Sequence, residues 1–218
     1  MCNRAERGDT HKVLNLFKAK RGARFNEGPL LVHPAQPGTV IRLENGERVL
    51  EQMTWGFPLV QKSKKTGLPL KPKPVNNARF DKLDTFFWKW TAVDPKHRCL
   101  IPTARYAEAV GEPGRMTETW LSVKDQPIFA WAGLWSHSVE WGDVYTGVMT
   151  DNAPELIDIH DRSPVILDPE DWDTWLHAPL EELYQFDQPY PGERLIVERT
   201  SMPWFQRKAS GSVDRALL

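Results

Sequence analysis

The residue with the clearest chemical potential is Cys2, which directly follows the first methionine of this 218-residue chain. Removal of Met1 would leave a cysteine whose free α-amine and thiol lie on adjacent carbons. Such an amine has an intrinsic pKa of about 7.7–8.0 and condenses with an aldehyde to an imine, on which the thiolate closes a five-membered thiazolidine. A cysteine at this position is also compatible with an ordinary terminal residue. Its role therefore depends on the residues that surround it.

Three further stretches combine polar with apolar residues: NARFD at 77–81, RCLIPTARYAEA at 98–109 and DIHDRSPVIL at 158–167. Together with MCNR at the start and TWGF at 54–57, they resemble the SRAP family, the SOS response-associated peptidase domain. The motifs occur in the family's order over nearly the whole chain. The resemblance implies a DNA-repair enzyme of crosslinking or lyase type. Its partner would be single-stranded DNA containing abasic sites, which it would bind covalently through the N-terminal cysteine.

The resemblance also implies four catalytic residues. Cys2 is the nucleophile. Glu108 protonates the ring oxygen of the abasic sugar, which suits a carboxyl group whose pKa is raised by partial burial. His160 transfers protons, because an imidazole with a pKa of about 6.5 can do so in both directions near neutrality. Asn77 holds the sugar or the cysteine amine by hydrogen bonds. Without the motifs, the last three would be interpreted as a solvated glutamate, a structural histidine and a helix cap.

A second set of residues is predicted to bind DNA. Forked guanidinium groups suit phosphates, and the resemblance gives this role to the motif arginines. Arg105 would add a phosphate contact. Trp55 and Phe57 are the aromatic residues that we expect to stack on an exposed base or to split the end of a duplex, because they lie beside a lysine-rich segment. The predicted DNA-binding residues are Arg4, Arg79, Arg162, Trp55, Phe57 and Arg105.

Charge is distributed unevenly along the chain, although the formal net charge is -1. Residues 61–82 contain seven basic side chains and one acidic one, whereas residues 151–187 contain eleven acidic side chains and one basic one. The lysine cluster from Lys62 to Lys73 is expected to form an exposed loop. It either extends the phosphate-binding surface or serves only solubility.

The chain departs from the family pattern at several positions. Asn3 stands where glycine is usual and restricts how closely the backbone approaches DNA. Near Glu108, the residues Ala104, Arg105 and Ala109 replace Asp, Gly and Trp, and VHPAQPG at 32–38 replaces a stretch that contains tyrosine and asparagine. The four catalytic positions are present. These departures therefore concern substrate geometry more than reaction type.

Two other functions fit the same residues. An N-terminal-nucleophile thiol hydrolase or peptidase would use Cys2 to attack an amide, and could remove Met1 itself, but no motif indicates an oxyanion hole. A non-catalytic single-stranded DNA binder would not need Cys2. No cofactor is expected. No metal is expected either, because His160, Asp158 and Asp161 have no second histidine at ligand spacing.

Composition indicates a folded, soluble protein. Hydrophobic residues make up 40% of the chain, with ten Trp and nine Phe, and the apolar runs are too short to span a membrane. The charged first 25 residues lack the apolar region of a signal peptide. Two cysteines are too few for a disulfide framework. We therefore expect a cytoplasmic monomer that acts at the nucleoid and has no membrane partner.

The elements expected to position these residues form one α+β domain with mostly antiparallel strands and peripheral helices, over residues 1–205, followed by a flexible tail over 206–218. Asn45-Gly46 predicts a hairpin turn. Buried strands are expected at 98–106, 126–135, 144–150 and 193–201. Helices are expected at 9–20, capped by Asp9 or Thr10, at 79–93, and at 167–179 with Asp168 as the N-cap. The tryptophans predicted to lie in the core are Trp88, Trp90, Trp131, Trp135, Trp172 and Trp175.

Overall fold

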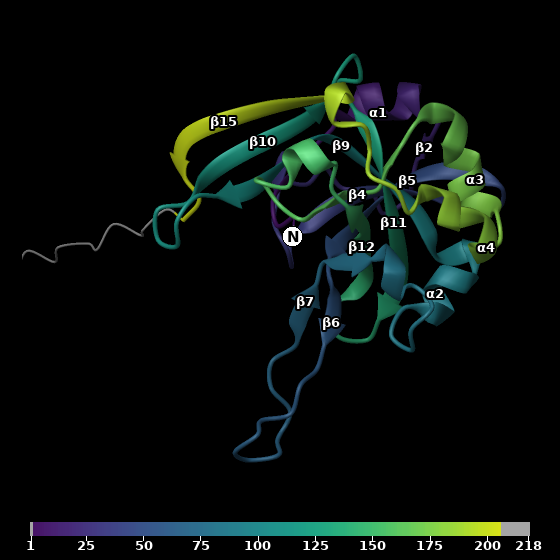
Figure 1. Ribbon diagram of the computed structural model, residues 1–218. Helices are drawn as coiled ribbons and strands as arrows, with labels where there is room; N and C mark the ends of the chain where they lie inside the picture. The colour runs from purple at the N-terminus through teal and green to yellow at the C-terminus, as the bar shows by residue number, and fades with distance from the viewer. Residues whose placement is uncertain (1, 206–218) are drawn as a thin grey trace, which may run out of the picture.

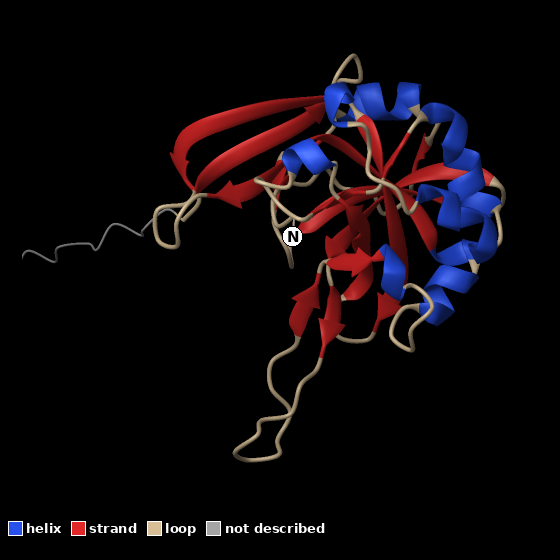
Figure 2. Ribbon diagram, in the orientation of Figure 1, coloured by secondary structure: helices blue, strands red, loops and turns tan. Residues whose placement is uncertain are grey.

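The computed structural model describes residues 2–205, and strands dominate its regular structure (Figure 2). The strands are β1 (Ala5–Arg7), β2 (Lys20–Arg21), β3 (Leu31–Val32), β4 (Pro37–Glu44), β5 (Glu47–Trp55), β6 (Phe57–Leu59), β7 (Lys73–Val75), β8 (Asn77–Arg79), β9 (Arg98–Val110), β10 (Thr117–Val123), β11 (Phe129–Ser138), β12 (Gly142–Asp151), β13 (Arg162–Pro164), β14 (Ile166–Leu167) and β15 (Leu195–Pro203). The predicted α+β class with mostly antiparallel strands is confirmed. The predicted tail lies outside the described residues.

Five long strands form a closed ring of pairings. β11 pairs with β12, β12 with β5, β5 with β4, β4 with β9, and β9 again with β11. The contacts of β12 with β5 and β8, and of β2 with β5, are parallel, and the other pairings between named strands are antiparallel. Closing the ring gives each of these strands two neighbours, and β1, β2, β8, β10, β13 and β14 pair with what remains of their edges.

The β4–β5 hairpin turns where the sequence predicts. Asn45 and Gly46 both have positive φ angles, 51° and 80°, as a type I′ turn requires, and Glu44 lies opposite Glu47. The four strands predicted between 98 and 201 correspond to β9, β11, β12 and β15.

The helices are short and lie along one side of the ring (Figure 2). They are α1 (Thr10–Leu16), α2 (Lys89–Val93), α3 (Trp172–His177) and α4 (Leu180–Leu183), with 3-10 turns at Phe80–Lys82, Pro95–His97, Pro154–Leu156, Pro169–Asp171, Tyr184–Phe186 and Gly192–Arg194. Asp9 caps α1 by accepting a hydrogen bond from the amide of Lys12, as predicted.

The continuous helix predicted over 79–93 is wrong. Residues 77–79 form strand β8 beside β12, and only Lys89–Val93 is α-helical. The helical spacing of the aromatic residues was misleading because the buried ones are Phe80, Leu83 and Trp88, whereas Phe86 is 99% exposed. Trp90, predicted to be a core residue, is 53% exposed.

Asp168 precedes a 3-10 turn and α3, but its side chain does not cap the helix. Its carboxylate instead accepts hydrogen bonds from Arg194, Tyr190 and Gln126. A bidentate guanidinium contact is stronger than a neutral amide cap, which explains why the predicted cap is not formed.

The core consists of two hydrophobic clusters. One includes the apolar residues of the helices, such as Phe17, Trp172 and Trp175, and the other includes Cys2, Trp55, Tyr106 and Trp131. Two extensions leave this body: the long β10–β15 ribbon, and the β6–β7 hairpin with its loop (Figure 1). In residues 2–205 we find no helix long and apolar enough to cross a membrane.

Candidate functional site

Cys2 lies in the protein interior with no exposed surface. The segment that follows it enters the sheet as β1, which pairs with β3 on one side and β9 on the other. The Cys2 thiol lies 3.5 Å from the carbonyl oxygen of Arg4, and that oxygen also accepts the amide N–H of Ala107. The position of Cys2 is therefore set by the β-sheet and not by a flexible terminus.

Two adjacent asparagines hold the backbone of Cys2. The side-chain amides of Asn76 and Asn77 donate to the Cys2 carbonyl oxygen over 2.9 Å and 2.7 Å. Asn77 is buried and begins β8, which runs parallel to β12 with Asn77 opposite Gly147. The NARFD motif predicts a role for Asn77 but none for Asn76, although the doubled asparagine in VNNAR is a visible signal in the sequence.

Glu108 belongs to β9 and is only 3% exposed. Burial raises its pKa from 4.5 to about 7. The positive charge of the N-terminal amine lowers this pKa, and the negative charge of Asp161 raises it. Burial also raises the pKa of the Cys2 thiol, and the charge of Glu108 raises it further. These two groups therefore interact, and Glu108 holds a proton for much of the time at neutral pH.

His160 lies in the loop before β13, and the side-chain amide of Asn152 donates to its carbonyl oxygen. Its Nδ1 lies 3.0 Å from the amide nitrogen of Arg162 and 2.8 Å from a carboxylate oxygen of Asp161. A neutral ring accepts from Arg162, and a protonated ring donates to Asp161. Burial lowers the pKa of His160, with a further contribution from the positive chain terminus. Both protonation states thus have a partner at Nδ1.

Each predicted phosphate-binding arginine has a carboxylate partner within the chain. Arg4 pairs with Glu118 and lies 4.2 Å from the ring of Trp204. Arg79 and Arg162 both contact Asp81, and Arg162 also contacts Asp151. Arg105 contacts Glu6 and Glu198. The structure thus brings Arg79 and Arg162 together at Asp81, whereas Arg105 contacts residues of β1 and β15 instead.

The stacking role predicted for Trp55 and Phe57 is wrong for this structure. Trp55 is 1% exposed, and Phe57 is buried against Trp88. The Trp55 ring stacks on Tyr145 and meets the edge of Trp131, so a base cannot reach it. Both residues follow the strand alternation of β5 and β6 into the core, a constraint that the neighbouring lysines concealed.

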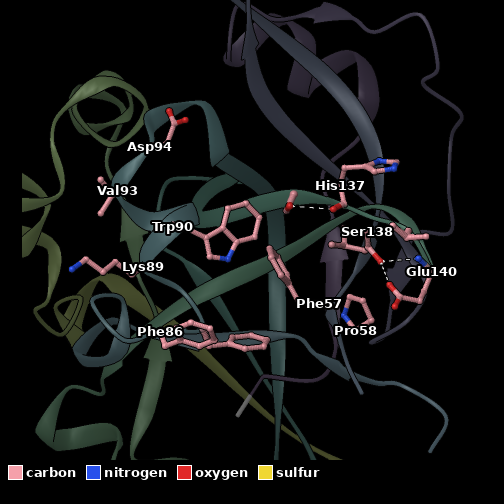
Figure 3. Close-up of a pocket in the computed structure, with 14 residues that line it drawn as sticks. Phe57, Pro58, Phe86, Lys89, Trp90, Val93, Asp94, His137, Ser138 and Glu140 are labelled. Carbon is pink, nitrogen blue, oxygen red and sulfur yellow. Dashed lines mark hydrogen bonds between the residues drawn. The ribbon is translucent and has the colours of Figure 1, made fainter. Parts of the chain in front are cut away.

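A cavity of about 770 Å3 lies at the base of the β6–β7 hairpin and is lined by Phe57, Phe86 and Trp90, among others (Figure 3). Figure 3 shows the rings of these three residues around the opening. Phe57 is the one predicted site residue in its lining, and Cys2 and Glu108 do not contribute. Within residues 2–205, no group of three or more His, Cys, Asp or Glu side chains could hold a metal ion.

The fold and the site define a single-domain α+β protein that encloses a cysteine at position 2 beside a carboxyl group of raised pKa. A family model described as SOS response associated peptidase (SRAP) matches residues 1–202. The chain belongs to the SRAP family, and the resemblance inferred from the motifs is confirmed.

Similar proteins carry consistent names. "Abasic site processing protein YoqW" of Bacillus subtilis is 31% identical over 112 residues, which are 48% of this chain and 50% of that protein. "Abasic site processing protein YobE" of the same organism is 29% identical over 164 residues, 67% of each chain. The chain spans about half the length of the YoqW relatives that it matches.

Solved structures share the fold. A protein from Bordetella bronchiseptica superimposes with a TM-score of 0.75 at 25% identity, over 91% of this chain and 99% of the other. A protein from Bacteroides thetaiotaomicron gives a TM-score of 0.71 at 19% identity, over 91% of both chains.

Proposed function

We propose that this protein processes abasic sites in single-stranded DNA and captures them covalently through Cys2 once Met1 has been removed. The observation that carries the proposal is the interaction between Cys2 and Glu108, a buried carboxyl group with a pKa of about 7 next to a buried thiol at position 2. A carboxyl group that is partly protonated at neutral pH is suited to general acid catalysis. The names of the Bacillus relatives support the same substrate.

The proposed reaction proceeds in balanced steps. Glu108 gives its proton to the ring oxygen of the closed sugar, and the bond between C1 and that oxygen breaks. The C1 hydroxyl gives up its proton to the carboxylate, which leaves the open aldehyde and restores the acid. The Cys2 α-amine adds to the carbonyl carbon, and loss of one water leaves an imine. The thiol then adds across the C=N bond, with sulfur bonding to carbon and the proton passing to nitrogen, which gives the thiazolidine. His160 transfers protons in these steps because both its charge states have a partner.

DNA binding is proposed to rest on basic groups around this site. The loop of residues 60–72, which we call the lysine finger, carries Lys62, Lys64, Lys65 and Lys71, all exposed. Strands β6 and β7 connect this loop to the body, and β7 ends directly before Asn76 and Asn77. Arg4 follows Cys2 by two positions in the sequence, and Arg162 follows His160 by two positions. Phosphates would replace Glu118, Asp81 and Asp151 as the partners of these arginines.

The test uses protein whose intact mass establishes that it begins at Cys2. This protein is incubated with a single-stranded oligonucleotide that contains one abasic site, and adducts are resolved after heating in denaturant. Cys2→Ala and Cys2→Ser serve as matched controls. A heat-stable adduct that needs Cys2 and the lesion supports the proposal. The absence of an adduct with processed wild-type protein contradicts the proposal. Cleavage of an amide substrate would then favour a thiol peptidase. Binding of the oligonucleotide by Cys2→Ala as tight as by the wild type, without any adduct, would favour a non-catalytic binder.

A further inference from the structure

Asn76 uses both hydrogens of its side-chain amide on the segment that begins with Cys2. One hydrogen bond reaches the carbonyl oxygen of Cys2 over 2.9 Å, and the other reaches the side-chain oxygen of Asn3 over 3.0 Å. Asn3 is exposed, and Asn76 is partly buried. The two asparagines thus form a polar contact at the surface edge of the site, 73 positions apart in the chain.

The backbone of Asn76 is itself firmly held. Its carbonyl oxygen accepts the indole N–H of Trp55 over 2.9 Å and the amide N–H of Gly147 over 3.2 Å. The Trp55 ring is fixed in turn by its stacking on Tyr145 and its edge contact with Trp131. The amide that contacts Cys2 is therefore presented from the rigid core, and this explains why Trp55 is buried rather than free to stack on a base.

We propose that Asn76 is a positioning residue for the Cys2 nucleophile and that Asn3 acts as its partner; this inference rests on the proposed function. A carbonyl oxygen has two lone pairs, and Asn76 and Asn77 together supply a donor for each. Two donors fix the plane of the peptide that joins Cys2 to Asn3. The orientation of that plane determines where the α-carbon of Cys2 directs its amine and its thiol.

Asn3 contributes by holding the side chain of Asn76 in the required orientation. An amide that donated only to Cys2 could rotate about its terminal torsion, whereas the second acceptor restricts it. Asn3 therefore acts through Asn76, and its effect should disappear when Asn76 is already absent. Such non-additivity is the expected signature of two residues in one hydrogen-bond network.

The first experiment measures single-turnover adduct formation on the abasic oligonucleotide, with processed wild-type protein and with the variants Asn76→Ala, Asn76→Asp, Asn3→Ala and the Asn3→Ala/Asn76→Ala double variant. Aspartate has nearly the same shape as asparagine, but when ionised it cannot donate. Asn15→Ala is the matched control, because Asn15 is exposed on α1 and makes no contact with Cys2.

Both Asn76 variants are expected to react about tenfold more slowly at saturating DNA, with little change in the half-saturating DNA concentration or the final yield of adduct. Asn3→Ala should be about threefold slower, and the double variant no slower than Asn76→Ala. A role limited to stability would lower the yield and the unfolding midpoint instead of the rate. Wild-type rates in the Asn76 variants overturn the inference, while an adduct in the wild type still supports the proposed function.

A second experiment measures alkylation of the Cys2 thiol in the same proteins without DNA, with Cys2 and Cys99 distinguished by peptide mass spectrometry. Loss of the Asn76 contact should speed modification of Cys2 several-fold and leave Cys99 unchanged. An unchanged rate at Cys2 overturns the inference. This measurement decides the role of Asn76 even if the wild type forms no adduct and the proposed function fails.

Discussion

The side-chain amide of Asn77 donates a hydrogen bond of 2.7 Å to the carbonyl oxygen of Cys2, across 75 positions of the chain. This contact joins the first residues to the strand β8, which is held in turn by β12. Because Asn77 is buried, its hydrogen bond is made away from water and is costly to lose.

Replacing Asn77 with leucine should therefore affect both stability and the proposed reaction. Leucine has a similar size but no donor, so a buried carbonyl group loses one partner. We expect the free energy of unfolding to fall by about 1–3 kcal/mol, measured by urea denaturation, and adduct formation to slow at least as much as in Asn76→Ala. A variant as stable and as fast as Asn15→Ala would show that this hydrogen bond is unimportant.

Glu108 should make stability depend on pH in a defined window. Its pKa is about 7 in the folded chain and 4.5 in the reference state, so the folded protein binds more protons between these values. Stability contributed by this group is therefore lost as the pH rises from 4.5 to 7, by up to about 3 kcal/mol. Glu108→Gln should lack this loss, so the variant gains stability relative to the wild type across the window. The free energy of unfolding is measured by urea denaturation at several pH values for both proteins. If it changes with pH in the same way in the wild type and in Glu108→Gln, the raised pKa is not that of Glu108.

Arg98 should be a major determinant of stability although it takes no part in the site. It is buried, and its guanidinium donates to the carbonyl oxygens of Ala92, Trp175 and Ala178 near the ends of α2 and α3. Arg98→Met would leave these acceptors without their donor, and we expect a loss of about 3–5 kcal/mol in urea denaturation. Arg199→Met, at an exposed ion pair with Asp158, is the control and should change stability by less than about 1 kcal/mol.

The lysine finger should account for part of the salt dependence of DNA binding. Replacing Lys62, Lys64 and Lys65 with alanine would remove up to three phosphate contacts. The slope of log K against log salt for a single strand should then become shallower by about 2. The control replaces Lys12, Lys18 and Lys124, which lie outside the finger. An equal slope for both triple variants would argue that the finger serves only solubility.

Much of the fold could be predicted from local patterns. Asn45-Gly46 and the β-branched runs determine the hairpin and the strands by short-range physics. Of the four residues that the motifs predict to act together, Cys2 contacts Asn77 and interacts with Glu108 in the structure. The structure of residues 79–93, where a continuous helix was wrongly predicted, was not predictable in this way. Its aromatic residues have a helical period, but Arg79 ends the strand β8 beside β12, and the segment after it buries Phe80, Leu83 and Trp88 without a continuous helix.

The errors in the predicted site have a similar origin. The prediction for Trp55 and Phe57 rests on their sequence neighbours, the exposed lysines, whereas strand alternation turns both rings into the core. The contact of Asn76 with Asn3 and Cys2 depends on the return of the chain after the lysine finger, and no local pattern encodes that distance.

The burial of Cys2 has a practical consequence for anyone who handles the protein. An affinity tag or fusion partner placed ahead of Cys2 would have to emerge from a position with no exposed surface, where β1 is already enclosed by β3 and β9. It would also occupy the amine on which the proposed reaction depends. Tags for purification, fluorescence or surface immobilisation therefore belong at the other end of the chain.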